Sequence, residues 1–165
     1  MAQQTIEVLG IDIGQVLVEQ FDPGVHFRGR NYLNAPELPE AFRVLRRLHR
    51  ERGMEIVLAT RCASPRLRTK RTEWLDHHDF WGRVGIPRVP PQYCWTPHYK
   101  SSVFYDRGIT HAVDDDPDEL VHLDLVPHLI LFRGRQDGIE KHRSFIDSRT
   151  TSVRSWAEIE VLWLP

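Results

Sequence analysis

Short apolar runs recur along the chain, and most of them are bounded by polar residues. Runs of this kind are typical of strands that are buried on both faces of a sheet. The pattern predicts strands at residues 6–12, 55–60, 111–114 and 128–132, and a weaker strand at 92–95. We therefore expect a sheet whose two faces are both covered.

Between these strands the apolar residues change to helical spacing. Residues 38–52 show such spacing and stop at a glycine, and a Ser-Pro pair opens a second helix over 65–77. Two further helices are predicted at 100–107 and 117–125. Alternation of buried strands with helices predicts a Rossmann-like three-layer α/β sandwich with a mainly parallel sheet.

The last part of the chain carries its own helix signal. Residues 155–158 read "SWAE", a capping box that predicts a final helix over about 155–163. The chain has 165 residues, of which 41% are hydrophobic, and it contains no internal repeat. These numbers fit a single domain over 1–165, with a core at about 6–133 and a C-terminal extension.

The charge balance is nearly neutral, with 22 Lys plus Arg against 23 Asp plus Glu and a net charge of -1. This balance gives no global electrostatic case for binding nucleic acid or a membrane surface. The first ten residues lack signal-peptide features, and no apolar run approaches the ~18 residues of a membrane span. We expect a cytoplasmic protein without a membrane partner. Cys62 and Cys94 have no metal-ligand spacing, and we expect reduced, partly buried thiols.

Polar side chains stand where the predicted strands end. Asp12 closes the first strand, and Thr60 closes the second. Asp114 and Asp115 end the strand "HAV", and Lys100 opens the helix before it. In parallel sheets, ligands bind beyond the carboxyl ends of the strands. Carboxylates there would suit Mg²⁺, and the lysine would offset the remaining negative charge of a phosphate site.

The order and spacing of these four elements resemble the haloacid dehalogenase-like (HAD) superfamily. The matching stretches read "GIDIGQVL", "IVLAT", "YK" and "HAVDDDPDEL", and they cover about residues 6–133. The ordered set is far more specific than any one of the four. The resemblance implies a HAD-like fold and a Mg²⁺-dependent hydrolase that acts on a phosphorylated substrate.

The resemblance also implies a role for each matching residue. Asp12 would be the nucleophile that forms an aspartyl-phosphate, and it would also ligate Mg²⁺. Thr60 would bind a phosphoryl oxygen, and Lys100 would neutralise the nucleophile and the phosphate. Asp114 and Asp115 would complete the metal site.

The chain departs from the family pattern two residues after Asp12. Phosphatases of this superfamily usually have a second aspartate there, which protonates the leaving group, but this chain has Gly14. The Gly14 carbonyl can still ligate the metal, whereas the acid/base is lost. General acid–base catalysis contributes roughly 10²–10⁴ in rate. Two interpretations stay open: an atypical hydrolase, or a catalytically impaired protein that binds a phosphorylated ligand or partner without turnover.

Some features would reduce the importance of the missing aspartate. Phosphoanhydrides and acyl phosphates have leaving groups that are already stable anions. Gln15, Arg61 or Asp116 could orient water, and we expect Gln15 and Arg61 to contact the substrate phosphate together with Thr60 and Lys100. Members that cleave carbon–halogen or carbon–phosphorus bonds also lack this aspartate, which keeps a non-phosphoester substrate open.

The two stretches that would carry a substrate-selecting cap are short. Residues 19–40 and 79–100 offer about 20 positions each, too few for a full cap domain. A minimal cap would admit a large substrate such as a nucleic-acid end or a phosphoprotein, or would require an oligomer to close over a small molecule. Arg28, Arg30 and Asn31 could reach a substrate anion from the first stretch.

Other charged residues have simpler interpretations. Asp118 and Glu119 fit an acidic helix start, where carboxylates favour the positive end of the helix dipole. His77 and His78 are neighbours on a helix, so their side chains diverge and should not share a metal. The basic run Arg66, Arg68, Lys70 and Arg71 could line a nucleic-acid groove, but a solvated helix face is the simpler interpretation.

Overall fold

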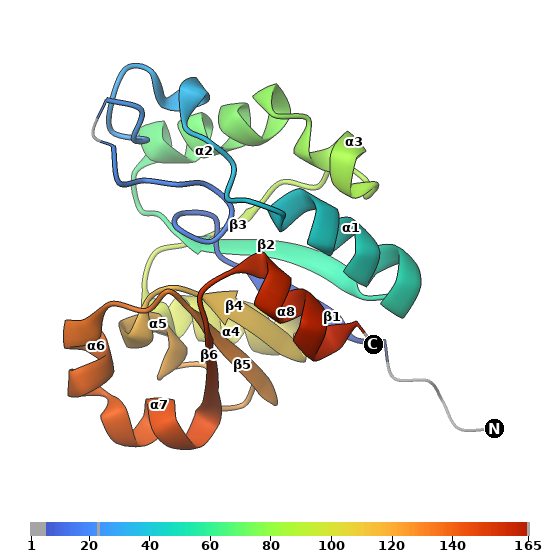
Figure 1. The fold of residues 1–165 in the computed structure, drawn as a ribbon. Coiled ribbons are helices and arrows are strands. Elements are labelled where there is room, and N and C mark those ends of the chain that lie inside the picture. The colour runs from blue at the N-terminus through green and yellow to red at the C-terminus, as the bar shows by residue number, and fades with distance from the viewer. Residues whose placement is uncertain (1–5, 23, 165) are drawn as a thin grey trace.

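A computed structural model describes residues 6–22 and 24–164, in which a six-stranded sheet forms the centre (Figure 1). The expectation about a signal peptide falls partly on residues 1–5, which lie outside the described part. Every strand pair is parallel. The spatial order of the strands is β3-β2-β1-β4-β5-β6. The strands are β1 Val8–Ile11, β2 Glu55–Arg61, β3 Gln92–Cys94, β4 His111–Asp114, β5 His128–Phe132 and β6 Thr150–Val153.

All five predicted strands are present, with ends that differ from the prediction by at most two residues. The sixth strand, β6, was not predicted because its sequence, "TTSV", is short and mostly polar. It pairs with β5 at the edge of the sheet, where its two central residues stay exposed. The two cysteines are free and buried, in agreement with the prediction of reduced thiols.

The helices that were predicted between the strands are also present, although α5 is shorter than expected and ends at Leu120. Three short helices, α3, α6 and α7, were not predicted because five to seven residues are too few to show a clear helical period. No helix in the described ranges has the length and hydrophobicity needed to cross a bilayer. The helices are α1 Ala41–Arg52, α2 Pro65–His77, α3 Phe80–Val84, α4 Pro97–Asp106, α5 Pro117–Leu120, α6 Gln136–Lys141, α7 Arg143–Arg149 and α8 Trp156–Trp163.

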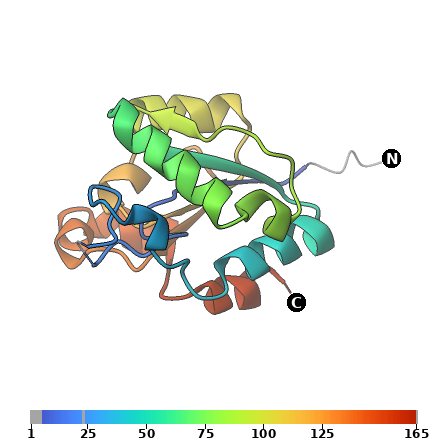
Figure 2. The same cartoon turned by 90° about the horizontal axis from the view of Figure 1, so that it is seen from above.

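Two hydrophobic cores, one on each face, make the molecule a three-layer α/β sandwich, as predicted. On one face α1, α2, α3 and α8 pack against the sheet, and Trp74 and Trp156 are fully buried there. On the other face α4, α5 and α7 contribute Phe104, Leu120 and Ile146. Figure 2 shows α1 and α8 together on one side of the sheet, with α4 on the opposite side. Burial on both faces explains why the central strands read as continuous apolar runs.

Gly10 in the middle of β1 allows α4 to pack closely on the sheet. A Cβ at this position would lie 2.8 Å from the Phe104 ring and 2.9 Å from Ile109, which is closer than real contacts allow. Thr96 caps α4 by accepting a hydrogen bond from the Tyr99 amide at 3.1 Å. This packing holds Lys100, in the first turns of α4, beneath the carboxyl edge of the sheet.

The described part of the first insert, residues 19–22 and 24–40, folds against α2 rather than into a cap domain. It contains a short 3₁₀ helix, Tyr32–Asn34. The Lys70 ammonium donates to the carbonyl oxygens of Phe27 at 3.0 Å and Gly29 at 2.6 Å. Phe27 is buried, and its ring meets Trp74 edge-on at a centroid distance of 6.4 Å. The insert therefore forms one wall of a site that stays open.

Candidate functional site

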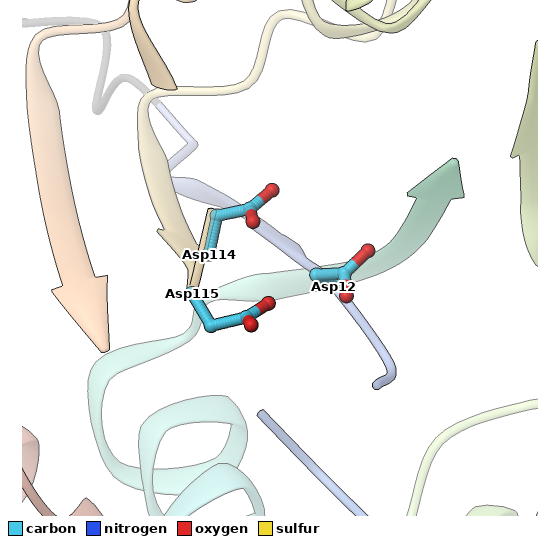
Figure 3. A group of neighbouring side chains, drawn as sticks. All are labelled: Asp12, Asp114 and Asp115. Carbon is cyan, nitrogen blue, oxygen red and sulfur yellow. The ribbon is translucent and has the colours of Figure 1, made fainter. Parts of the chain in front are cut away.

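Asp12, Asp114 and Asp115 come together at the carboxyl ends of β1 and β4 (Figure 3). Each offers a carboxylate oxygen, and these oxygens all lie within 4.8 Å of one another. The two strands are hydrogen-bonded neighbours, and the ladder continues to Asp12, whose amide donates to the Val113 carbonyl at 3.1 Å. Parallel pairing therefore brings together side chains that are about a hundred positions apart in the sequence.

Lys100 is the central cation of this cluster and is only 1% exposed. Its ammonium lies 2.5 Å from Asp114 Oδ2 and 3.4 Å from Asp12 Oδ1. A third carboxylate, that of Glu119, lies 3.9 Å away. Burial alone would lower the pKa of Lys100, but the attraction of the three carboxylates outweighs it and raises the pKa. Lys100 is therefore a permanently charged group at the floor of the site.

One lysine does not balance the carboxylates around it. Burial, with the charge of Asp114 as the next cause, raises the pKa of Asp115 to about 9. Burial also raises the pKa of Asp114 to about 7, although the contact with Lys100 opposes this shift. Burial is the first cause of both raised pKa values and the neighbouring carboxylates add to it, whereas a cation at the site would oppose both effects.

The donor set fits a hard divalent cation. Three carboxylates from two adjacent strand ends supply the oxygen ligands that Mg²⁺ prefers. Of the groups of acidic, histidine and cysteine side chains in the described residues, this is the one close enough to hold a metal. His77 and His78 are not part of this group.

Thr60 also lies at this edge, next to β1 along the sheet, and is 1% exposed. Its hydroxyl oxygen accepts a hydrogen bond from the Arg71 guanidinium, which reaches across from α2. The same guanidinium donates to the carbonyl of Arg61 at 3.1 Å. Because its oxygen is already an acceptor, the Thr60 hydroxyl keeps its proton free to donate to a ligand.

The space beside Gly14 faces Arg71. An ideal Cβ built at Gly14 would lie 4.0 Å from Arg71 Nη2 and 4.0 Å from Asp12 Oδ2. Both are ordinary contact distances, and the φ angle of Gly14 is not in the left-handed region. Gly14 is therefore not required by the backbone, and the Arg71 guanidinium faces the space that a side chain at position 14 would enter.

Arg71 was assigned to a solvated helix face, and this interpretation was wrong. Leu67, Arg71 and Trp74 follow one another at helical spacing, so Arg71 lies on the face of α2 that turns inward. Its Nε is buried without a hydrogen-bond partner in the described part of the chain. The signal in the sequence was the helical spacing of Arg71 with the apolar residues Leu67 and Trp74, which places all three on the same face of the helix.

Glu119 corrects a second interpretation. Asp118 does behave as a helix-start residue: it is partly exposed and pairs with Lys141 at 2.6 Å and His142 at 2.7 Å. Glu119 instead is 3% exposed, with Arg61 Nε at 2.8 Å and the Lys100 ammonium within 4 Å. Burial raises the pKa of Glu119. The short α5 begins at the end of β4, so its third residue turns back towards the site.

A hollow of about 380 Å³ covers these groups. Gln15, which has a left-handed φ of 59°, and Arg28 from the first insert both line it, whereas Arg30 and Asn31 do not. The hollow brings together most of the predicted residues, but the buried Lys100 lies behind its wall. Its lining is Asp12, Gly14, Gln15, Gln20, His26, Phe27, Arg28, Thr60, Arg61, Leu67, Arg71, Asp114, Asp115, Asp116 and Glu119.

Comparison with known proteins supports the fold. No protein-family model and no curated protein sequence matches the chain. Among solved structures, the D,D-heptose 1,7-bisphosphate phosphatase from Burkholderia thailandensis is similar, with a TM-score of 0.63 and 14% sequence identity. The match covers 96% of this chain and 98% of that one. The predicted HAD-like, Rossmann-like fold is thereby confirmed.

Proposed function

We propose that this protein is a Mg²⁺-dependent phosphohydrolase in which Asp12 attacks the phosphorus of a phosphorylated substrate. The observation that carries the proposal is the convergence of Asp12, Lys100, Asp114 and Asp115 at one edge of the sheet. A carboxylate beside a buried ammonium and two further carboxylates combines a nucleophile with the means to hold a metal and a phosphate. The HAD-like fold, shared with a solved phosphatase, agrees with this chemistry.

In the proposed reaction Asp12 forms a bond to phosphorus while the bond from phosphorus to the leaving oxygen breaks. Lys100 holds Asp12 ionised and offsets negative charge as the phosphoryl group transfers. The Thr60 hydroxyl donates a hydrogen bond to a phosphoryl oxygen. Mg²⁺, held by Asp12, Asp114, Asp115 and the Gly14 carbonyl, would supply the remaining positive charge. Water then attacks the aspartyl-phosphate, which releases phosphate and restores Asp12.

The open shape of the hollow affects which classes of substrate can bind. A minimal cap and a basic wall from α2 fit a phosphorylated small molecule, including a nucleotide, or the phosphorylated end of a nucleic acid. The related phosphatase is named for a sugar bisphosphate, which makes a compound with two phosphates a reasonable member of the test panel. We propose a cytoplasmic location, and an oligomer could close the site over a small substrate.

The competing function is a protein that binds a phosphorylated ligand or partner without turnover. Gly14 is the observation that favours it, because no carboxyl group occupies the usual place of the proton donor. In that case phosphate and Mg²⁺ would bind together, but no phosphate would be released.

The test is phosphate release from a panel of phosphomonoesters, sugar bisphosphates, nucleoside di- and triphosphates, acyl phosphates and phosphorylated oligonucleotide ends. We expect at least one substrate to turn over with Mg²⁺ and to stop with EDTA. Asp12→Asn should lower kcat by roughly 10³-fold or more, since it removes the nucleophile. Asp106→Asn, an exposed change on α4, is the matched control and should have no effect.

Turnover that persists in Asp12→Asn would refute the proposed nucleophile. Binding of substrate and Mg²⁺ without any release would favour the competing function. Calorimetry with the same panel separates this outcome from a protein that has no phosphate site.

A further inference from the structure

Arg71 is a cation without a carboxylate partner in a site rich in carboxylates. In the described part of the chain its hydrogen bonds go to the Thr60 hydroxyl and the Arg61 carbonyl, and no carboxylate oxygen lies within 4 Å of it. The other two cations near the floor differ, since Lys100 and Arg61 are both paired with acidic side chains. The Arg71 Nη2 lies on the Gly14 side, next to open space in the hollow.

We propose that Arg71 binds the leaving group, and that this leaving group is itself a phosphate, so that the bond cleaved is a phosphoanhydride. The inference rests on the proposed function and adds a substrate class and a substrate-contacting residue to it. Where the superfamily usually supplies an acid, this chain presents a guanidinium at the leaving-group side. An acid donates a proton to a leaving oxygen, whereas a guanidinium stabilises an oxygen that leaves with its negative charge.

The chemistry of a phosphoanhydride matches this arrangement. As Asp12 bonds to the terminal phosphorus, the bond from that phosphorus to the bridging oxygen breaks, and both bonding electrons stay on the bridging oxygen. The leaving phosphate is stable as an anion, so it needs no proton at this step. In the second step water attacks the aspartyl-phosphate, and its proton passes to the released phosphate. An alkyl ester lacks this route because an alkoxide is a poor leaving group without an acid.

Arg28 and His26 extend the cationic side of the hollow. Arg28 is exposed, lines the hollow and has no acidic partner among the described residues. Burial lowers the pKa of His26, and the nearby positive charges of Arg28 and Arg71 lower it further. The local field on this side is therefore positive, which suits the charge of a second phosphate.

The position of Arg71 also determines how a side chain introduced at position 14 would behave. A carboxyl group at position 14 would lie next to Arg71 Nη2, and that cation would hold it ionised. An ionised carboxylate cannot act as a general acid. We therefore expect Gly14→Asp by itself to give no gain with alkyl phosphates, whereas Gly14→Asp combined with Arg71→Met should gain roughly 10-fold or more.

The decisive experiment compares pyrophosphate, ADP, p-nitrophenyl phosphate, fructose 1,6-bisphosphate and glycerol phosphate as substrates of wild type, Arg71→Met and Arg66→Met. Methionine preserves length and helix propensity, and Arg66 is an exposed arginine on the same helix, so Arg66→Met is the matched control. We expect Arg71→Met to lower kcat on pyrophosphate and ADP by roughly 10²-fold, with a much smaller loss on p-nitrophenyl phosphate. Equal losses on all substrates would mean that Arg71 acts only through Thr60, and would overturn the proposal.

A sugar bisphosphate that turns over faster than the anhydrides, with the same dependence on Arg71, would also overturn it. That result would place Arg71 at a distal phosphate rather than at the leaving oxygen. The outcome differs from failure of the proposed function, in which Asp12→Asn would leave these rates unchanged.

A binding measurement tests the contact between Arg71 and the leaving phosphate separately from turnover. Imidodiphosphate, in which nitrogen replaces the bridging oxygen, resists hydrolysis and can be titrated by calorimetry. Arg71→Met should weaken imidodiphosphate binding by roughly 10-fold or more and orthophosphate binding by much less. Equal affinities of wild type and Arg71→Met for imidodiphosphate would refute the inference.

Discussion

The two edges of the sheet carry similar kinds of side chain but differ in how their charges are paired. At the amino edge a hollow of about 660 Å³ is larger than the one at the carboxyl edge. Its charged groups are nevertheless paired: Arg52 donates to Glu7 at 2.6 Å. The His111 ring stacks on His128 at 4.4 Å and its Nδ1 shares a hydrogen bond with Thr110 at 2.8 Å.

At the carboxyl edge, by contrast, the charged side chains that the structure describes are not all paired with partners of opposite charge. Asp12 and Asp114 share Lys100 as their nearest cation, whereas Glu119 pairs with Arg61 at 2.8 Å and lies 3.9 Å from Lys100. Arg71 faces the opposite wall without an acidic partner among the described residues. Unpaired charge rather than the size of the hollow therefore distinguishes the edge that could bind a metal and an anion.

The largest effect on stability should follow from removing the lysine at the carboxyl edge. Lys100→Met leaves Asp114 and Asp12 without their buried counter-charge, and we expect a loss of about 3–5 kcal/mol in the free energy of unfolding. Urea denaturation in metal-free buffer measures it. Lys141→Met removes a surface pair with Asp118 and should cost less than about 1 kcal/mol. Similar losses for the two variants would show that the ion pairs of Lys100 stabilise the fold no more than the surface pair of Lys141.

Acid should weaken the amino edge by a somewhat smaller amount. Burial, with His128 as a second cause, lowers the pKa of His111 to about 4, while Glu7 opposes the shift and Arg52 supports it. Above the ordinary pKa of about 6.5 the ring is neutral in both states. Between pH 6.5 and 4 the unfolded chain binds the proton more readily, so the free energy of unfolding should fall by up to roughly 3 kcal/mol.

Urea denaturation of wild type and His111→Phe at pH 7.5 and 4.5 isolates this contribution. The other titrating groups are common to both proteins, so the difference between their pH dependences reports His111. An equally steep fall in His111→Phe would assign the acid sensitivity to another group.

The smallest effect should be the response to Mg²⁺, and it should be confined to the carboxyl edge. Binding at concentrations well above the dissociation constant stabilises the folded state by about 1–3 kcal/mol, which corresponds to a rise of roughly 3–9 °C in Tm. Asp115→Asn removes one of the three clustered carboxylates and should abolish most of the rise. Glu7→Gln, at the amino edge, should keep it. A shift that survives Asp115→Asn would place the cation elsewhere.

Much of the fold was predictable because the central strands and the longer helices bury one or both faces, and burial leaves a clear hydropathy pattern. β6 and the short helices α3, α6 and α7 were missed because their residues are few or largely polar. Their conformation depends on what they pack against, as in β6, which gains its backbone partners from β5. A local hydropathy pattern does not indicate which element a segment pairs with.

For the candidate site, the sequence alone determined which strand ends carry Asp12, Thr60, Asp114 and Asp115, because strand ends follow from hydropathy and side-chain chemistry follows from residue type. Gly14 was likewise visible as a missing carboxyl group. The tertiary structure alone decided that Arg71 faces Gly14 and that Glu119 turns inward to Arg61 and Lys100. The orientation of a helix relative to its neighbours determines which of its charges meet, and this orientation arises from packing between elements that are distant in the sequence.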